Sequence, residues 1–81
     1  MKHAGDGALA RLEPLLVDLR NVPGLKETKL GVFYRGRRAF LHFHEDGTTL
    51  YADVHFSEDW ERLPVGTAEE RSELLRRIHS T

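Results

Sequence analysis

Two histidines separated by one residue, His42 and His44, lie in the segment AFLHFHEDGTTLYADVHF, residues 39–56. In a β-strand, residues two apart point to the same side, so both imidazoles share one face. An H-x-H pair on a strand is a spacing that zinc, nickel and iron sites use. A metal ion needs at least one more ligand, and Asp53 lies on the next predicted strand. The sequence therefore offers His42, His44 and Asp53 as candidate metal ligands.

The predicted hairpin turn decides whether these three residues converge. If Asp46 and Gly47 are its two central residues, Asp53 is diagonal to His42, about 7 to 8 Å away between backbones, and farther from His44. Ligands in this arrangement diverge. The register therefore favours a solvated sheet face over a resident metal, and no cofactor is predicted.

Catalysis by these histidines lacks a nucleophile. The chain contains no cysteine, and Thr49, at the turn, is the only serine or threonine predicted on the face of the histidines. The segment GVFYRGRR matches neither a phosphate-binding loop nor a dinucleotide-binding pattern. The sequence predicts a protein that is not an enzyme and has no catalytic residue.

The elements that must position these residues follow from two periodicities. Apolar residues from Leu9 to Leu19 recur at helical spacing, and Pro14 among them predicts either a kink or a helix start. From Glu27 to Val65 the period becomes two, which predicts an antiparallel meander. A second helix is predicted after Thr67, its N-cap, with Glu70 as the capping-box partner.

The predicted fold class is α+β: a helix, an antiparallel meander of three to four strands and a second helix, with both helices on one face of the sheet. The fourth strand, around WERLPV, contains Pro64 and is restricted to an edge or a connection. The 81 residues predict one domain, residues 1–81, with residues 1–7 flexible.

Charge and hydropathy limit the partners of the chain. Twelve basic and thirteen acidic residues argue against attachment to nucleic acid or anionic lipid through overall charge. The apolar run near the N-terminus is short and interrupted by charges, which predicts neither a signal peptide nor a membrane span. We therefore expect a cytoplasmic protein with no membrane partner.

Alternation along the strands assigns residues to two faces. The core face is predicted to carry Leu30, Val32, Tyr34, Leu41, Phe43, Leu50, Ala52, Val54 and Phe56. The opposite face, the predicted interaction face, is expected to carry Phe33, Arg35, Arg38, Phe40, His42, His44, Tyr51 and His55. Trp60 is expected in the core, beneath the second helix.

Exposed aromatic residues beside arginines call for a function. We expect an interaction or structural module that forms a homodimer through its sheet, which would bury these aromatics. The alternative is a nucleic-acid-binding module, in which bases stack on Phe33, Phe40 and Tyr51 while arginines contact phosphates. The histidine metal site is the third possibility.

Two resemblances concern the fold. The segment VPGLKETKLGVFYRGRRAFLHFHEDGTTLYADV resembles short bacterial proteins, a domain of unknown function, in which a run GVFY...GRAFLHFHED...LYADV recurs. A more distant resemblance is to the MmcQ/YjbR family, whose outline of helix, PG, acidic turn and aromatic strands is matched by the GLKET segment, Phe33, Gly36 and Phe40. Both cover roughly residues 22 to 56 and imply the helix, sheet and helix arrangement rather than an activity.

Overall fold

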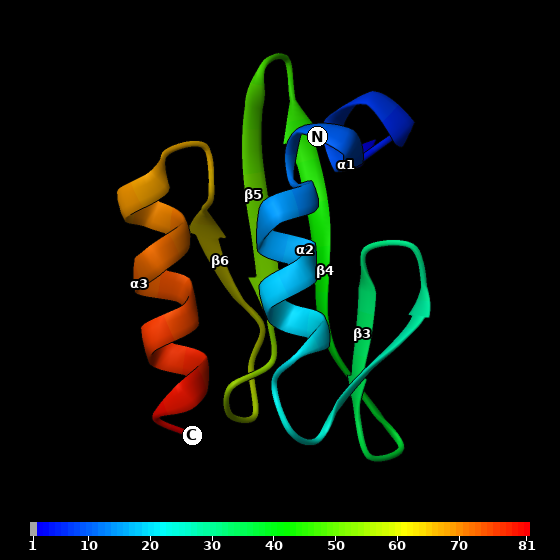
Figure 1. Cartoon of the computed structure of the whole chain (residues 1–81), viewed down its shortest axis with the longest axis vertical. Coiled ribbons are helices and arrows are strands. Elements are labelled where there is room, and N and C mark those ends of the chain that lie inside the picture. Colours follow the sequence, from blue (N-terminus) through cyan, green and yellow to red (C-terminus); the bar gives the residue numbers. More distant parts are fainter. Residues whose placement is uncertain (1) are drawn as a thin grey trace.

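A computed structural model describes residues 2–81, which form a sheet with helices against one of its faces (Figure 1). In chain order the elements are β1 (Lys2–His3), α1 (Asp6–Arg11), α2 (Glu13–Arg20), β2 (Leu25–Lys29), β3 (Val32–Arg35), β4 (Arg38–Asp46), β5 (Thr49–Val54), β6 (Glu61–Pro64) and α3 (Ala68–His79). The α+β class is confirmed.

The strands run in the spatial order β2-β3-β4-β5-β6, and β1 pairs with β4 outside this path. All these pairings are antiparallel. The sheet has more strands than the predicted three to four, partly because a turn at Leu30 and Gly31 divides the run KLGVFY between β2 and β3. Gly31 has φ +77°, and a Cβ atom there would lie 2.6 Å from Cδ2 of Leu9, so glycine is required at this turn. The predicted strand around WERLPV is β6, at one edge of the sheet.

The helices begin where the sequence places their signals. Pro14 lies in the first turn of α2, which separates this helix from α1 at Leu12. Before α3, Thr67 Oγ1 accepts a hydrogen bond from the Glu70 amide at 3.1 Å, and Glu70 Oε1 accepts one from the Thr67 amide at 3.0 Å. The predicted capping box is thus confirmed. None of the helices within residues 2–81 is both long and apolar enough to cross a membrane.

The core lies between the sheet and the helices, and α2 and α3 are on the same face of the sheet (Figure 1). Five residues predicted for the core face are buried there: Leu41, Phe43, Leu50, Ala52 and Val54. The helices contribute buried side chains at helical spacing: Leu12, Leu15, Leu16, Leu19, Leu74 and Ile78.

A β-bulge at Phe40 overturns the predicted faces of β3. Phe33 pairs with Leu41 and Tyr34 pairs with Ala39, so Phe40 is an extra residue on β4. One extra residue exchanges the two faces of β3 relative to β4. Phe33 therefore points into the core with 0 % of its surface exposed, and the prediction that placed it on the interaction face was wrong.

The predicted placements of several other residues assigned by alternation were also wrong. Phe40 is buried, with 3 % of its surface exposed, because the bulge turns its side chain toward Phe56. Leu30, predicted for the core, is 54 % exposed. Val32 and Tyr34, also predicted for the core, are only partly buried.

The turn between β4 and β5 lies one residue later than predicted. Asp46 pairs with Thr49, so the turn residues are Gly47 and Thr48, and Gly47 has φ +62°. This register leaves residues 41–46 of β4 and the residues of β5 on their predicted faces but gives each a new neighbour. His42 now faces Asp53 directly.

Candidate metal centre

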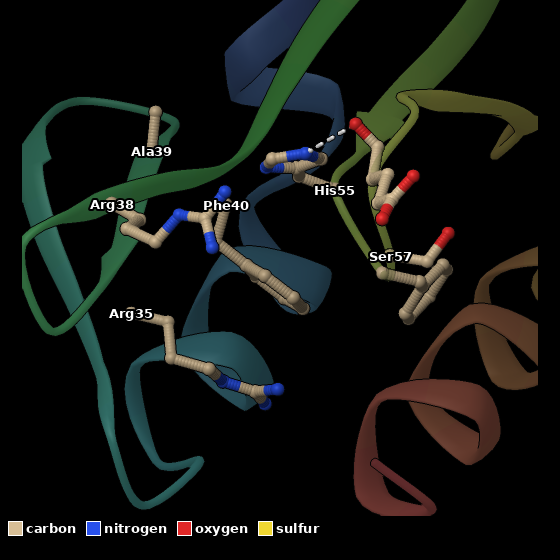
Figure 2. A pocket seen from close by; sticks show the side chains of 8 residues that line it. Arg35, Arg38, Ala39, Phe40, His55 and Ser57 are labelled. Carbon is tan, nitrogen blue, oxygen red and sulfur yellow. Dashed lines mark hydrogen bonds between the residues drawn. The ribbon is translucent and has the colours of Figure 1, made fainter.

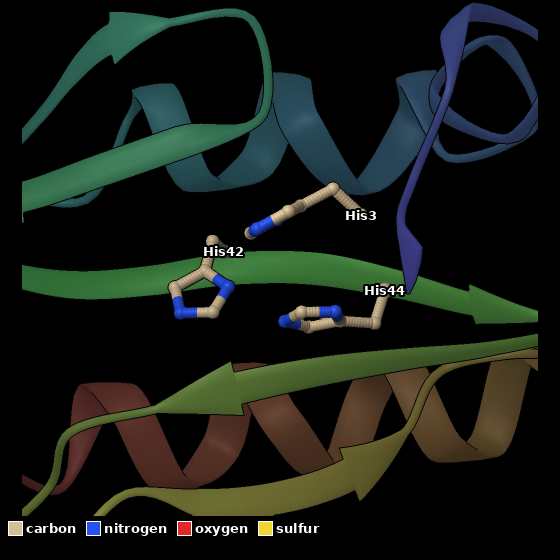
Figure 3. Close-up of side chains that lie close together, drawn as sticks. All are labelled: His3, His42 and His44. Carbon is tan, nitrogen blue, oxygen red and sulfur yellow. The ribbon is translucent and has the colours of Figure 1, made fainter. Parts of the chain in front are cut away.

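Three histidines meet on the face of the sheet that points away from the helices, which we call the outer face. β4 is nine residues long, and β3 occupies only part of one edge, between Arg38 and Leu41. β1 pairs with the same strand farther along, with His3 opposite His44. His42 is two residues from His44 on β4, so the sheet places all three rings side by side (Figure 3).

The three rings contact one another. The His3 ring stacks on the His44 ring with 4.7 Å between centroids, and the His42 ring lies 4.8 Å from His44 and 5.6 Å from His3. Each residue offers one ring nitrogen in a set whose members all lie within 4.8 Å of one another. The three nitrogens are thus near enough for one metal ion to reach all of them if the rings rotate.

Main-chain and side-chain contacts hold His3 beside β4. The Ala4 amide donates to the Phe43 carbonyl oxygen at 3.1 Å, and the Gly5 amide donates to Oε2 of Glu45 at 2.7 Å. Lys2 Nζ lies 3.8 Å from Oε1 of the same carboxylate. Glu45 thus contacts the residue before His3, Lys2, and a residue after it, Gly5.

Asp53 supports the cluster from β5. Its Oδ2 atom lies 3.0 Å from Nε2 of His44, whereas the predicted register placed it farther from His44 than from His42. Arg62 on β6 holds the carboxylate in place, with Nε donating to Oδ1 at 2.7 Å and Nη2 to Oδ2 at 2.9 Å. These hydrogen bonds lower the pKa of Asp53 below its ordinary value, so the carboxylate stays charged at neutral pH.

Two ring nitrogens of the cluster are buried without a hydrogen bond to any described residue: Nδ1 of His42 and Nε2 of His44. For His44, the contact with Asp53 is close, but its geometry is not that of a hydrogen bond. Burial, and then the neighbouring His44, lower the pKa of His42 below 6.5. His42 is therefore neutral at pH 7, as a metal ligand must be.

The lowered pKa of His42 predicts a loss of stability in mild acid. The unfolded chain takes up a proton near the ordinary pKa of 6.5, whereas the folded chain takes it up at lower pH. The destabilisation is absent well above pH 6.5, grows as the pH falls from about 6.5 toward the folded pKa, and stays constant below the folded pKa. We expect the free energy of unfolding, measured with urea, to decrease between about pH 7 and pH 5, and less steeply in His42→Gln. His79→Gln, at an exposed position, is the control and should keep the pH dependence of the unmodified chain. If the stability of His42→Gln fell with pH as steeply as that of the unmodified chain, the assignment to His42 would be wrong.

Trp60 lies on the outer face, where we had not expected it. Its side chain is 44 % exposed, so the predicted place beneath the second helix was wrong. The indole stacks on His55, with centroids 4.9 Å apart and 13° between planes, and lies 4.9 Å from the His42 ring. The imidazole of His55 shares a hydrogen bond of 3.0 Å with the Glu58 carbonyl oxygen through Nε2. Trp60 is thus an optical probe next to the cluster.

The predicted interaction face is only partly formed. His42, His44, Tyr51 and His55 are partly buried, whereas Phe33 and Phe40 lie in the core. Arg35 and Arg38 flank the turn between β3 and β4. The aromatic surface that suggested a homodimer or nucleic-acid binding has therefore lost two of its three proposed aromatics.

Sequence reasoning found two of the three clustered histidines and missed His3. The signal for His42 and His44 was their spacing on one strand, but His3 reaches them through a pairing about forty residues away in sequence. Nothing local marks Lys2–His3 as a strand, because two residues carry no periodicity.

Comparisons of this chain with protein-family models, with curated proteins and with solved structures found no match. The resemblances described from the sequence therefore remain predictions.

Proposed function

We propose that this protein binds a divalent transition-metal ion through His3, His42 and His44. The observation that supports the proposal most directly is the set of three ring nitrogens within 4.8 Å of one another. In a tetrahedral site with metal–nitrogen distances of about 2.0 to 2.1 Å, ligand nitrogens are roughly 3.3 Å apart. Binding would therefore require the rings to rotate, including the stacked rings of His3 and His44.

The ligand types select the class of metal. Imidazole nitrogen suits zinc, copper and nickel, whereas calcium and magnesium take oxygen ligands. Three protein ligands leave a fourth coordination position for water or another small ligand. Asp53, held by Arg62, lies 3.0 Å from Nε2 of His44 and would orient this histidine if the contact became a hydrogen bond on metal binding.

Self-association through the sheet is the second proposal. It is supported by Trp60, a large apolar side chain that is 44 % exposed on the outer face. Nucleic-acid binding receives no comparable support, because two of the aromatics predicted to stack with bases, Phe33 and Phe40, are buried.

A titration with Zn²⁺ and Cu²⁺ tests the metal proposal. We expect one ion per chain by isothermal titration calorimetry. Since Trp60 is the single tryptophan and its ring lies 4.9 Å from His42, bound Cu²⁺ should quench its fluorescence. His42→Gln and His44→Gln should each weaken Zn²⁺ binding by about a hundredfold, and Asp53→Asn by about tenfold.

His79→Gln is the matched control, because His79 is exposed near the end of α3 and distant in sequence from the cluster. The proposal would be wrong if His79→Gln weakened binding as much as His42→Gln did. It would also be wrong if the unmodified chain bound no stoichiometric Zn²⁺ at about 0.1 mM, a weak affinity for a histidine site.

A further inference from the structure

A second candidate site lies away from the three histidines, at the end of the sheet where β3 turns into β4. A cavity of about 350 Å³ opens there between this turn and the segment that follows β5. Its lining includes Arg35, Arg38, Phe40, His55, Ser57 and Glu58. Figure 2 shows the arginines and Phe40 on one side, with His55 and Ser57 across from them. The volume is at the lower end of the range for small-molecule sites.

Within the described part of the chain, the arginines of this cavity lack the carboxylate partner that four other arginines have. Among residues 2–81, Arg20, Arg62, Arg76 and Arg77 each form an ion pair with a carboxylate. Arg35 and Arg38 form none with the described residues. Glu58 is the one acidic residue in the lining, so the cavity carries an excess of positive charge.

Contacts within the protein hold the Arg35 side chain in place without a ligand. Its guanidinium carbon lies 4.3 Å from the centre of the Phe40 ring, a cation–π contact. Its Nη1 atom donates to Oγ1 of Thr81 at 2.9 Å, which leaves other guanidinium N–H groups free. A guanidinium held in one place by an aromatic ring binds a planar or tetrahedral anion with two parallel hydrogen bonds.

The bulge at Phe40 positions the aromatic part of the cavity lining. It buries the Phe40 ring, which meets the Phe56 ring edge to face with centroids 5.9 Å apart. Arg77 in turn holds Phe56 from α3, with its guanidinium carbon 4.5 Å from the ring centre. The cavity thus combines the partly buried Phe56 ring with two arginines that have no carboxylate partner among the described residues, which suits a ligand with an apolar body and an anionic head.

We infer that this cavity binds a small organic anion, either a carboxylate or a phosphate monoester, with the anionic group on Arg35 and Arg38 and the apolar body against the partly buried Phe56. The site is independent of the metal proposal, since it shares no residue with the three histidines or with Asp53. A long polyanion fits it poorly, because Glu58 lines the opposite side.

The test uses the full chain labelled with ¹⁵N and four probes: phenyl phosphate, benzoate, inorganic phosphate and neutral benzyl alcohol. We expect saturable shifts of the Phe40, His55 and Ser57 amide signals with phenyl phosphate or benzoate below about 10 mM. The tighter of these two identifies the head group. Inorganic phosphate should bind more weakly than phenyl phosphate, because it lacks the apolar body.

Variants connect the shifts to the arginines. Arg38→Gln should weaken binding about tenfold, and Arg35→Lys, which keeps the charge but not the planar fork, should weaken it as well. Arg37→Gln is the matched control, since Arg37 is exposed between these two residues and does not line the cavity. Its affinity should equal that of the unmodified chain.

Four outcomes would overturn the inference. These are no shift with either organic anion, equal binding of benzyl alcohol, equal weakening by Arg37→Gln, and shifts of the same signals by a single-stranded oligonucleotide at lower concentration. The last result would assign the arginines to nucleic acid. Far-UV circular dichroism of each variant confirms that it is folded.

Discussion

Replacing Phe33 with alanine is expected to lower the free energy of unfolding by about 3 to 5 kcal/mol. Phe33 is the largest side chain with essentially no exposed surface, and it belongs to the core beneath the helices. Its loss would remove a large apolar contact and leave a cavity that the sheet and helices cannot fully close. Small domains have a free energy of unfolding of only about 5 to 15 kcal/mol, so the substitution would remove a large part of it. Urea unfolding followed by circular dichroism measures the change.

Leu30→Ala is the control for this prediction. Leu30 lies three residues before Phe33 and is 54 % exposed, so its truncation should change the stability by no more than about 0.5 kcal/mol. Strict alternation without the bulge predicts the reverse order, with Leu30 in the core and Phe33 outside. If Leu30→Ala proved the more damaging of the two, the bulge at Phe40 would be misplaced.

Zinc is expected to stabilise the folded chain strongly. If the ion binds the folded but not the unfolded chain, free Zn²⁺ at a hundred times its dissociation constant adds about 2.7 kcal/mol to the free energy of unfolding. For a domain of this size, that corresponds to a rise in melting temperature of about 10 to 20 °C. The physical reason is that His3 lies on β1 whereas His42 and His44 lie on β4, so unfolding separates His3 from the other two histidines. Thermal denaturation with and without Zn²⁺ measures the rise.

Two controls test whether the stabilisation comes from Zn²⁺ bound to the three histidines. His42→Gln should abolish most of the rise, whereas His79→Gln, on the exposed side of α3, should retain it. Mg²⁺, which prefers oxygen ligands, should have little effect on the unmodified chain. A rise of equal size with Mg²⁺, or in His42→Gln, would show that the stabilisation does not come from the three histidines.

The sequence predicts the elements of this fold better than their registers. Helical spacing and the capping box locate α2 and α3, because those signals are local. The faces of β5, and of β4 from Leu41 onward, also follow from local alternation. The faces of β3 do not, because the bulge at Phe40 adds one residue, and nothing in the sequence around Phe40 marks a bulge.

The candidate metal centre could be predicted only in part for a related reason. His42 and His44 are evident from their spacing, but the approach of Asp53 depends on whether the turn is centred on Asp46 and Gly47 or one residue later. The contribution of His3 depends on a pairing between distant parts of the chain. Trp60 was misplaced because a single tryptophan in a small protein is usually part of the core.

If the proposed metal site forms, the short strand β1 makes its affinity depend on a docking equilibrium. Two of the proposed ligands, His42 and His44, belong to a strand with neighbours on both edges, whereas His3 belongs to a two-residue strand held by a few contacts to Phe43 and Glu45. If β1 is docked in only a fraction of the molecules, the apparent dissociation constant equals the intrinsic constant divided by that fraction. Conversely, each bound ion shifts the population toward docked β1. In that case the Lys2–Glu45 ion pair and the Gly5–Glu45 hydrogen bond, which do not involve the histidines, would influence the affinity of the proposed site through this population.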